Sequence, residues 1–169
     1  MKITSVNLPK LTQAGNDFLF YNKALTTLTA PKLTRVGESF LCYNKVLTAL
    51  SLPKLTEVGN NFLFSNKALT SLDLPDVTHV GPSFLCYNQA LTTLIAPKLT
   101  HVGDNFLCHN KALTTLNLPS LICVGNSFLC NNQALTTLTA PKVTTIGRCF
   151  LFSNPKARMP YENNFYQPA

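Results

Sequence analysis

The sequence repeats every 22 residues, and this period constrains the fold more than any local propensity does. Four residue types recur at this step without an insertion or deletion. Their series run from Pro9 to Pro141, from Gly15 to Gly147, from Phe18 to Phe150 and from Asn22 to Asn154. A fixed period of this length is typical of solenoids, propellers and other repeat arrays. All seven glycines of the chain belong to the repeat, so none is left for a nucleotide-binding loop.

One unit, residues 25–46, shows what the repeat encodes locally. Thr27 and Thr29 alternate with apolar residues, which is the period-two pattern of a short strand. Pro31 is expected to end this strand, because proline has no amide hydrogen with which to continue a ladder. A second short extended piece should follow. Gly37 is then expected to permit a turn, in a backbone conformation that other residues disfavour.

Stacking of the units is required, because 22 residues cannot bury their own apolar face. Phe40 and Leu41 are apolar in every unit and are expected in the core. The Asn44 column predicts a buried ladder of amides that satisfy backbone groups of the neighbouring coil, since a buried unpaired amide is costly. A regular threonine column predicts hydrogen bonds between coils; it comprises Thr26, Thr48, Thr70, Thr92, Thr114 and Thr136.

The segment from Leu47 to Leu55 reads LTALSLPKL and resembles a leucine-rich repeat. Its continuation, Leu-Thr-x-Val-Gly-x-x-Phe-Leu-x-x-Asn, resembles the BspA-like class of bacterial and protist leucine-rich repeats. The resemblance covers residues 3–154, although that family tends to have Ala-Phe where Phe40 and Leu41 stand here. It implies a leucine-rich-repeat solenoid of seven 22-residue coils, mainly β with short irregular or helical turns and a parallel sheet on one face. Family members are commonly surface-exposed or secreted proteins that bind other proteins.

The repeat also predicts the organisation of the chain. Residues 1–154 are expected to form the solenoid. The pattern degrades at Pro155, so residues 155–169 are expected to form a C-terminal cap or tail. No run of apolar residues is long enough for a transmembrane helix, and the N-terminus lacks the apolar region of a signal peptide. These features favour an intracellular location or export by a non-classical route.

The outward positions of the first strand are the predicted partner-binding surface. They carry small hydroxyl and amide groups and vary more than the rest of the unit, but they lack the aromatic and arginine residues that dominate ordinary interfaces. The predicted positions are Thr27, Thr29, Ser51, Ser71, Asp73, Thr93, Ile95, Thr115 and Asn117. The alternative is that threonine merely favours strands.

Positive charge is concentrated in two columns, within a formal net charge of +7. Lys32, Lys54 and Lys98 belong to the first column, and Lys45, Lys67 and Lys111 belong to the second. Such stripes could attract an anionic glycan or lipid surface, or could simply keep the loops solvated. The scarcity of arginine and of a basic helix argues against nucleic-acid binding.

The cysteines and histidines predict neither a metal site nor an enzyme. Cys42, Cys86, Cys108 and Cys130 share a column with phenylalanines, so we expect reduced thiols in an apolar environment. His79, His101 and Cys123 fall in one column of otherwise variable residues, and no CxxC motif occurs. No catalytic constellation emerges, and no cofactor is expected. The sequence therefore predicts a non-enzymatic scaffold that binds a protein partner; a structural spacer that associates end to end is the alternative.

Overall fold

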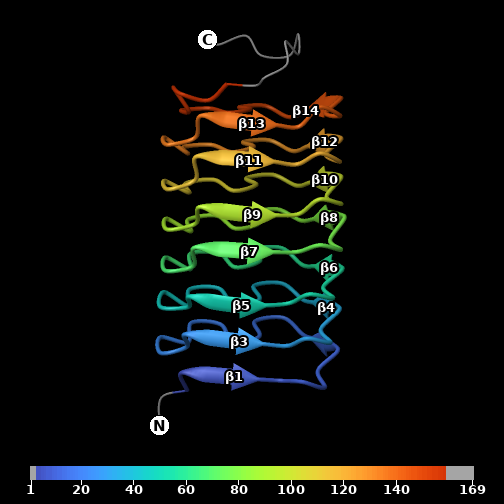
Figure 1. Ribbon diagram of the computed structural model, residues 1–169, viewed down its shortest axis with the longest axis vertical. Helices are drawn as coiled ribbons and strands as arrows, with labels where there is room; N and C mark the ends of the chain where they lie inside the picture. Colours follow the sequence, from blue (N-terminus) through green and yellow to red (C-terminus); the bar gives the residue numbers. More distant parts are fainter. Residues whose placement is uncertain (1–2, 159–169) are drawn as a thin grey trace.

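The computed structural model describes residues 3–158, which form one stack of coils (Figure 1). Each coil contributes a strand of three residues to the front of the molecule as drawn in Figure 1. These front strands are β1 (Ser5–Asn7), β3 (Thr27–Thr29), β5 (Ala49–Ser51), β7 (Ser71–Asp73), β9 (Thr93–Ile95), β11 (Thr115–Asn117) and β13 (Thr137–Thr139). The predicted leucine-rich-repeat solenoid is therefore confirmed, with seven strand pairs.

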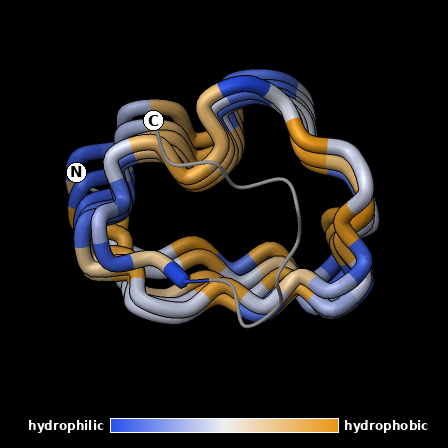
Figure 2. The backbone as a smooth tube through the Cα atoms, turned by 90° about the horizontal axis from the view of Figure 1, so that it is seen from above, coloured by the Kyte–Doolittle hydropathy of each residue, from blue (hydrophilic) through white to orange (hydrophobic). Residues whose placement is uncertain are grey.

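A second strand of two residues follows in each coil, after the proline turn. These strands are β2 (Gln13–Ala14), β4 (Arg35–Val36), β6 (Glu57–Val58), β8 (His79–Val80), β10 (His101–Val102), β12 (Cys123–Val124) and β14 (Thr145–Ile146). The turns within residues 3–158 contain no helix, and this part of the chain has no segment suited to crossing a membrane as a helix. Viewed along the stack, the coils superimpose, so each corner keeps its hydropathy from coil to coil (Figure 2).

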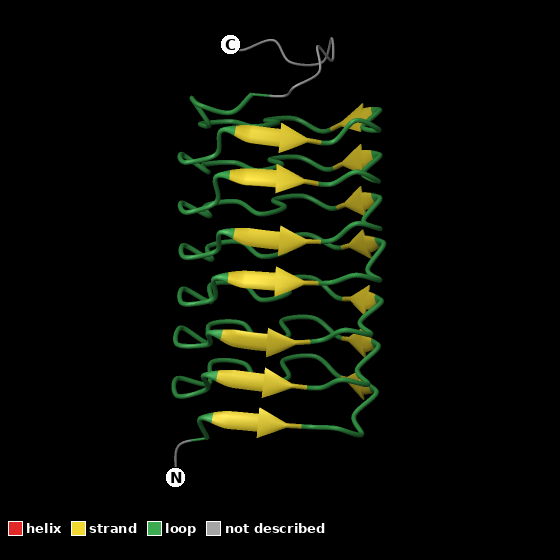
Figure 3. Cartoon of the chain, in the orientation of Figure 1, coloured by secondary structure: helices red, strands yellow, loops and turns green. Residues whose placement is uncertain are grey.

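Parallel strands pair on two faces of the stack, where a sheet on one face was predicted. The two-residue strands make a continuous seven-stranded sheet in the order β14-β12-β10-β8-β6-β4-β2. The front strands pair in three separate groups, β1-β3-β5, β7-β9 and β11-β13 (Figure 3). Between neighbouring strands, each residue lies opposite the residue 22 positions away, as in Ser71 opposite Thr93. The sequence pattern located both extended pieces but indicated neither the second sheet nor the two interruptions of the front one.

The phenylalanine column forms the centre of the core. Rings of successive coils stack with centroids 5.3–5.7 Å apart and planes within 8° of each other, from Phe18 to Phe150. Phe40 and Leu41 are both fully buried, as predicted. Strand β3 ends before Pro31, where the amide of Leu33 donates to the carbonyl of Ala30 and closes a turn. The core is thus continuous through the stack.

The predicted asparagine ladder is confirmed. Asn44 Oδ1 accepts a hydrogen bond from the backbone amide of Asn22 at 2.9 Å, and its Nδ2 donates to the carbonyl of Leu19 at 2.8 Å. Equivalent bonds continue to Asn154 in the last coil. One member differs, because Oδ1 of Asn66 is buried without a hydrogen-bond partner. The ladder therefore joins each coil to the one before it through side-chain amides.

The threonine column has the predicted role in four of its six members. The hydroxyl groups of Thr26, Thr48, Thr92 and Thr136 donate to the backbone carbonyl of the threonine one coil earlier. The two remaining members, Thr70 and Thr114, lie at the interruptions between β5 and β7 and between β9 and β11. Side-chain and main-chain pairing are therefore lost together there.

The expectation for the repeated glycine was wrong. No glycine of the described residues has a positive φ angle. Close approach of the coils explains the residue instead: a Cβ atom on Gly59 would lie 2.6 Å from the backbone nitrogen of Glu38 and from the carbonyl carbon of Gly37. The left-handed conformation occurs at three other positions of each coil, such as Ser39, Leu41 and Tyr43, with φ angles of 56°, 55° and 61°.

The end of the last coil is partly covered by the residues that follow it. Ala157 is buried, and the carbonyl of Arg158 accepts a hydrogen bond from the amide of Leu138 at 3.1 Å. The predicted boundary at residue 154 stays a prediction. Residues 159–169 of the predicted cap or tail lie outside the described residues.

Candidate functional site

The predicted partner-binding positions lie on the outer face of the front strands. In each strand from β7 to β11 the central leucine is buried and the two flanking residues are exposed. Thr27 in β3 is half-buried, whereas Ile95 in β9 is 51% exposed. The register places Ser71 beside Thr93, and Asp73 beside Ile95. The stack therefore gathers short polar groups and one aliphatic side chain onto a single face.

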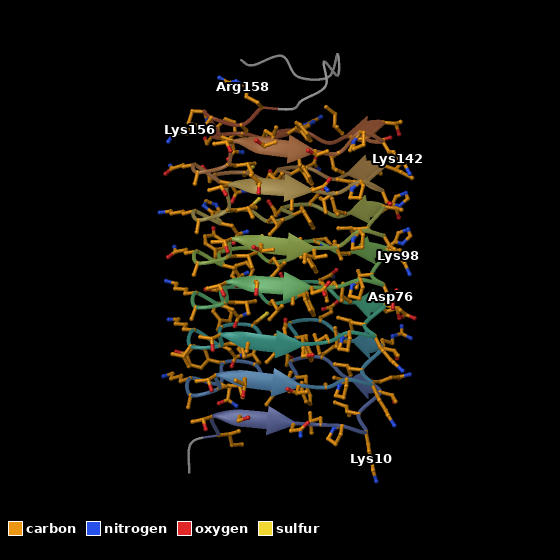
Figure 4. The ribbon with its side chains drawn as sticks, in the orientation of Figure 1. Lys10, Asp76, Lys98, Lys142, Lys156 and Arg158 are labelled. Carbon is orange, nitrogen blue, oxygen red and sulfur yellow. The ribbon has the colours of Figure 1, made fainter. Side chains whose placement is uncertain are left out.

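The first lysine column lies along one edge of the molecule, where Figure 4 labels Lys10, Lys98 and Lys142. Lys98 Nζ lies 2.7 Å from Oδ1 of Asp76, which interrupts the column. Both side chains are well exposed, so this ion pair adds little stability. In the second column, Lys23 Nζ lies 4.9 Å from the centroid of the Tyr21 ring, a cation–π distance.

The column of His79, His101 and Cys123 lies along the second sheet. The two imidazole rings stack with centroids 4.6 Å apart. The hydroxyl of Thr100 donates to the carbonyl of Thr78, so it accepts from Nδ1–H of His101. Among residues 3–158, no three metal-ligating side chains are placed to hold an ion.

The cysteine column is buried, as expected from its exchange with phenylalanine. Cys42, Cys86, Cys108 and Cys130 are all buried and free, and three of them form a cluster with Phe64. Burial raises the pKa of the Cys42 thiol, and it raises the pKa of Cys130 to about 11. Cys42 and Cys130 therefore hold little thiolate at neutral pH.

Thiol labelling should separate the buried cysteines from the others. We expect Cys149, which is exposed, to react first with Ellman's reagent at pH 7.5, and Cys123, which is half-buried, to react second. The remaining thiols should react at a useful rate only after unfolding in guanidinium. Quantitative peptide mapping of the labelled protein measures this order, and rapid labelling of Cys42 in the folded protein would contradict the buried column.

A groove that the sequence analysis missed lies where cysteines replace phenylalanines in three successive coils. It has a volume of about 400 Å³. Its lining includes Phe64, Ser83, Cys86, Tyr87, Asn105, Cys108, His109, Ser127, Cys130 and Asn131. His109 stacks on Tyr87 with ring centroids 4.4 Å apart, at the repeat position that Tyr21, Tyr43 and Tyr87 hold in other coils. The sequence signal for this groove is the replacement of phenylalanine by the smaller cysteine at the same repeat position in three neighbouring coils.

Short parallel strands, a leucine core and outward-facing polar side chains define a leucine-rich-repeat solenoid. Family comparison agrees: the model of the BspA type leucine-rich repeat region, with six copies, matches residues 1–92 and 43–158. The chain therefore belongs to the BspA-type leucine-rich repeat family. Proteins of this family and fold generally mediate protein interactions or act as scaffolds, and they are typically non-enzymatic.

Comparison with curated proteins gives no match. Among solved structures, the chain is similar to a leucine-rich cell surface protein from Faecalibacterium prausnitzii A2-165, at 12% sequence identity and a TM-score of 0.35. The match covers 96% of this chain and 61% of that one.

Proposed function

We propose that this protein is a recognition scaffold that binds a protein partner through the outer face of its front strands. The central part of this face runs from Ser51 in β5, through Ser71 and Asp73 in β7, to Thr93 and Ile95 in β9. The exposure of these five residues, on three neighbouring strands of one face, is the observation that supports the proposal.

The character of the face fits a partner that approaches closely. Short side chains lose little rotamer entropy when they are covered, so the face can bind without ordering long flexible groups. Ile95 provides an exposed apolar contact, and Asp73 beside it provides one negative charge. The core-facing residues are nearly identical between coils, whereas these outer positions change from one coil to the next.

Replacement of this face by charge tests the proposal. We expect Ser51→Lys, Ser71→Lys and Thr93→Lys, combined in one variant, to abolish retention of the partner that wild-type protein captures from cell extracts. Three lysines add bulk and positive charge at the centre of the face, where desolvation of unpaired charge is costly. Quantitative mass spectrometry of captured proteins measures the loss.

A matched variant controls for charge alone. Gln13→Lys, Gln89→Lys and Gln133→Lys add the same charge at exposed positions outside the front strands. This control should retain the partner, and both variants should keep the circular dichroism spectrum and melting temperature of the wild type. Equal retention of the partner by the two variants would show that the binding site is not on the front face. If the wild type captures no partner at all, the structural spacer is favoured.

A further inference from the structure

Cys86 and Cys108 occupy the same position in neighbouring coils and hold the same side-chain conformation. The thiol of Cys86 donates to the carbonyl of Asn105 at 2.7 Å, and that of Cys108 donates to the carbonyl of Ser127 at 2.8 Å. Each acceptor stands 19 residues after its donor, so the second contact repeats the first one coil later. The two sulfur atoms are therefore related by the step from one coil to the next.

Other side chains of the same two coils give the length of this step. Three pairs of stacked rings join the two coils, with centroids 4.4–5.4 Å apart; they are His79 with His101, Phe84 with Phe106, and Tyr87 with His109. The backbones of neighbouring parallel strands are about 4.8 Å apart. Two sulfur atoms at this step are too far apart for a disulfide, whose S–S bond is about 2.0 Å long. One ion fits between them.

The separation suits a metal ion held in a line between two sulfur atoms. A metal–thiolate bond is about 2.3 Å long, so two such bonds on opposite sides of one ion span about 4.6 Å. Structural zinc sites take four ligands, and iron–sulfur clusters are held by four cysteines. In the described part of the chain, no group of three metal-ligating side chains could hold an ion. Monovalent copper, Cu(I), prefers soft thiolates and is stable with two of them in a line.

The ionisation of the pair is shared between its two thiols. Hydrogen bonding from the Cys108 thiol lowers the pKa of Cys86, and the same interaction raises the pKa of Cys108 above its ordinary value. A thiolate therefore forms first at Cys86. Binding of the ion releases the protons of both thiols to solvent. The hydrogen bonds given up are weak ones, because a thiol is a poor donor.

The groove over the cysteine column gives an ion access to the pair. Cys86 and Cys108 are only 2% and 4% exposed, but both line this groove of about 400 Å³. A single ion passed on by a small thiol needs far less room than Ellman's reagent, which carries two aromatic rings. Burial that protects these thiols from the reagent therefore still allows copper to exchange.

Cys130 continues the row of thiols but is not equivalent to the pair. Its Sγ lies 3.6 Å from the carbonyl of Cys149, so the contact that Cys86 and Cys108 share is lengthened in this coil. The regular step therefore ends at Cys108, and the ion is placed between Cys86 and Cys108.

Cys42 supplies a single thiol in the same setting. Its thiol donates to the carbonyl of Asn61 at 2.8 Å, as in the pair. Its two neighbours in the column are Phe20 and Phe64, which offer no ligand. Cys42 is therefore a matched control for the effect of a neighbouring thiol.

We propose that Cys86 and Cys108 bind one Cu(I) ion in linear coordination between neighbouring coils. The two thiolates are the only protein ligands that this geometry requires. The site is separate from the front face and does not depend on the protein-binding proposal.

Competition for Cu(I) without oxygen tests the site. All proteins compared carry Cys123→Ser and Cys149→Ser, so that the more accessible thiols do not bind copper. The reduced protein should withdraw one Cu(I) per chain from its coloured complex with bathocuproine disulfonate. Cys86→Ser and Cys108→Ser should each lower the affinity by more than about tenfold, the least that loss of even an outer-shell partner of a metal costs. The single-thiol control Cys42→Ser should leave the affinity unchanged.

A second variant and a spectrum make the test independent of folding. Cys108→Phe introduces the residue that the same column carries at Phe20, Phe64 and Phe152, so the melting temperature should stay close to that of the parent while copper binding is lost. X-ray absorption at the copper edge should show two sulfur neighbours.

Three results would overturn the site. The first is failure of the parent protein to withdraw copper from the chelator. The second is undiminished affinity in a folded Cys86→Ser, Cys108→Ser or Cys108→Phe protein, or an equal loss in Cys42→Ser. The third is a spectrum with three or four ligands on the copper, which would exclude linear coordination by this pair.

Discussion

Asn110→Ala should lower the free energy of unfolding by about 3–5 kcal/mol. Oδ1 of Asn110 accepts from the backbone amide of Asn88 at 2.7 Å, and its Nδ2 donates to the carbonyl of Leu85 at 2.9 Å. All of this lies in the fully buried centre of the stack. The substitution therefore orphans a buried donor and a buried acceptor that water cannot reach. Guanidinium unfolding followed by circular dichroism measures the loss.

The first coil contains a control for this result. Asn22 occupies the same column, but its side chain makes no hydrogen bond within residues 3–158 and is half-buried. Asn22→Ala should therefore cost less than about 1 kcal/mol. Similar losses for the two variants would show that the column acts through local turn propensity and not through bonds between coils.

Gly59→Ala should destabilise the protein by about 2–3 kcal/mol. The new Cβ atom would meet three backbone atoms of the preceding coil, at 2.6–2.7 Å. Backbone cannot move aside as a flexible side chain can, so the coils would have to separate along the stack. Because the φ angle of Gly59 is not positive, the cost reports contact between coils and not backbone conformation. Unfolding in guanidinium also measures this effect.

Gly15→Ala is the matched control, since a Cβ atom there meets nothing within 4 Å among the described residues. This substitution should leave stability unchanged or raise it by up to about 1 kcal/mol, because alanine loses less backbone entropy on folding than glycine. A large loss for Gly15→Ala would mean that the glycine is needed for its conformation, as the sequence analysis supposed.

Much of the fold could be predicted from the sequence because the same pattern recurs in seven coils, so what is predicted for one coil applies to all of them. The periodic proline, phenylalanine and asparagine positions gave the strand ends, the core and the amide ladder. The explanation for Gly37 was wrong because there are two reasons for a glycine to recur in every coil, conformational freedom and close approach of the backbones. The structure distinguishes them by the φ angle of Gly37, which is not positive, and by its close approach to the backbone of Gly15.

The candidate sites were predicted less completely, and for a different reason. The outer strand positions follow from period-two alternation, so their exposure could be predicted from the sequence. The groove depends on side-chain volume summed across Cys86, Cys108 and Cys130, which are 22 residues apart. Each cysteine alone resembles an ordinary core residue. The space becomes visible only when the coils are stacked and Tyr87 is seen beside it.

The residues with left-handed backbone conformation join successive coils on one side of the solenoid, whereas the interrupted front strands allow it to bend on the other. Within one coil, the amide of Leu41 donates to the preceding coil, whereas the amides of Ser39 and Tyr43 donate to the following one. Such bonds continue behind the interruption between β5 and β7, where the amide of Ser65 donates to the carbonyl of Cys86 at 2.9 Å.

Bending should therefore concentrate at the two interruptions of the front strands, between β5 and β7 and between β9 and β11, while the turn-rich side keeps its length. A partner bound across either interruption could adjust the curvature of the front face at little cost to the core. The solenoid would then fit its ligand by bending at these two places, while the distance between coils on the turn-rich side stays constant.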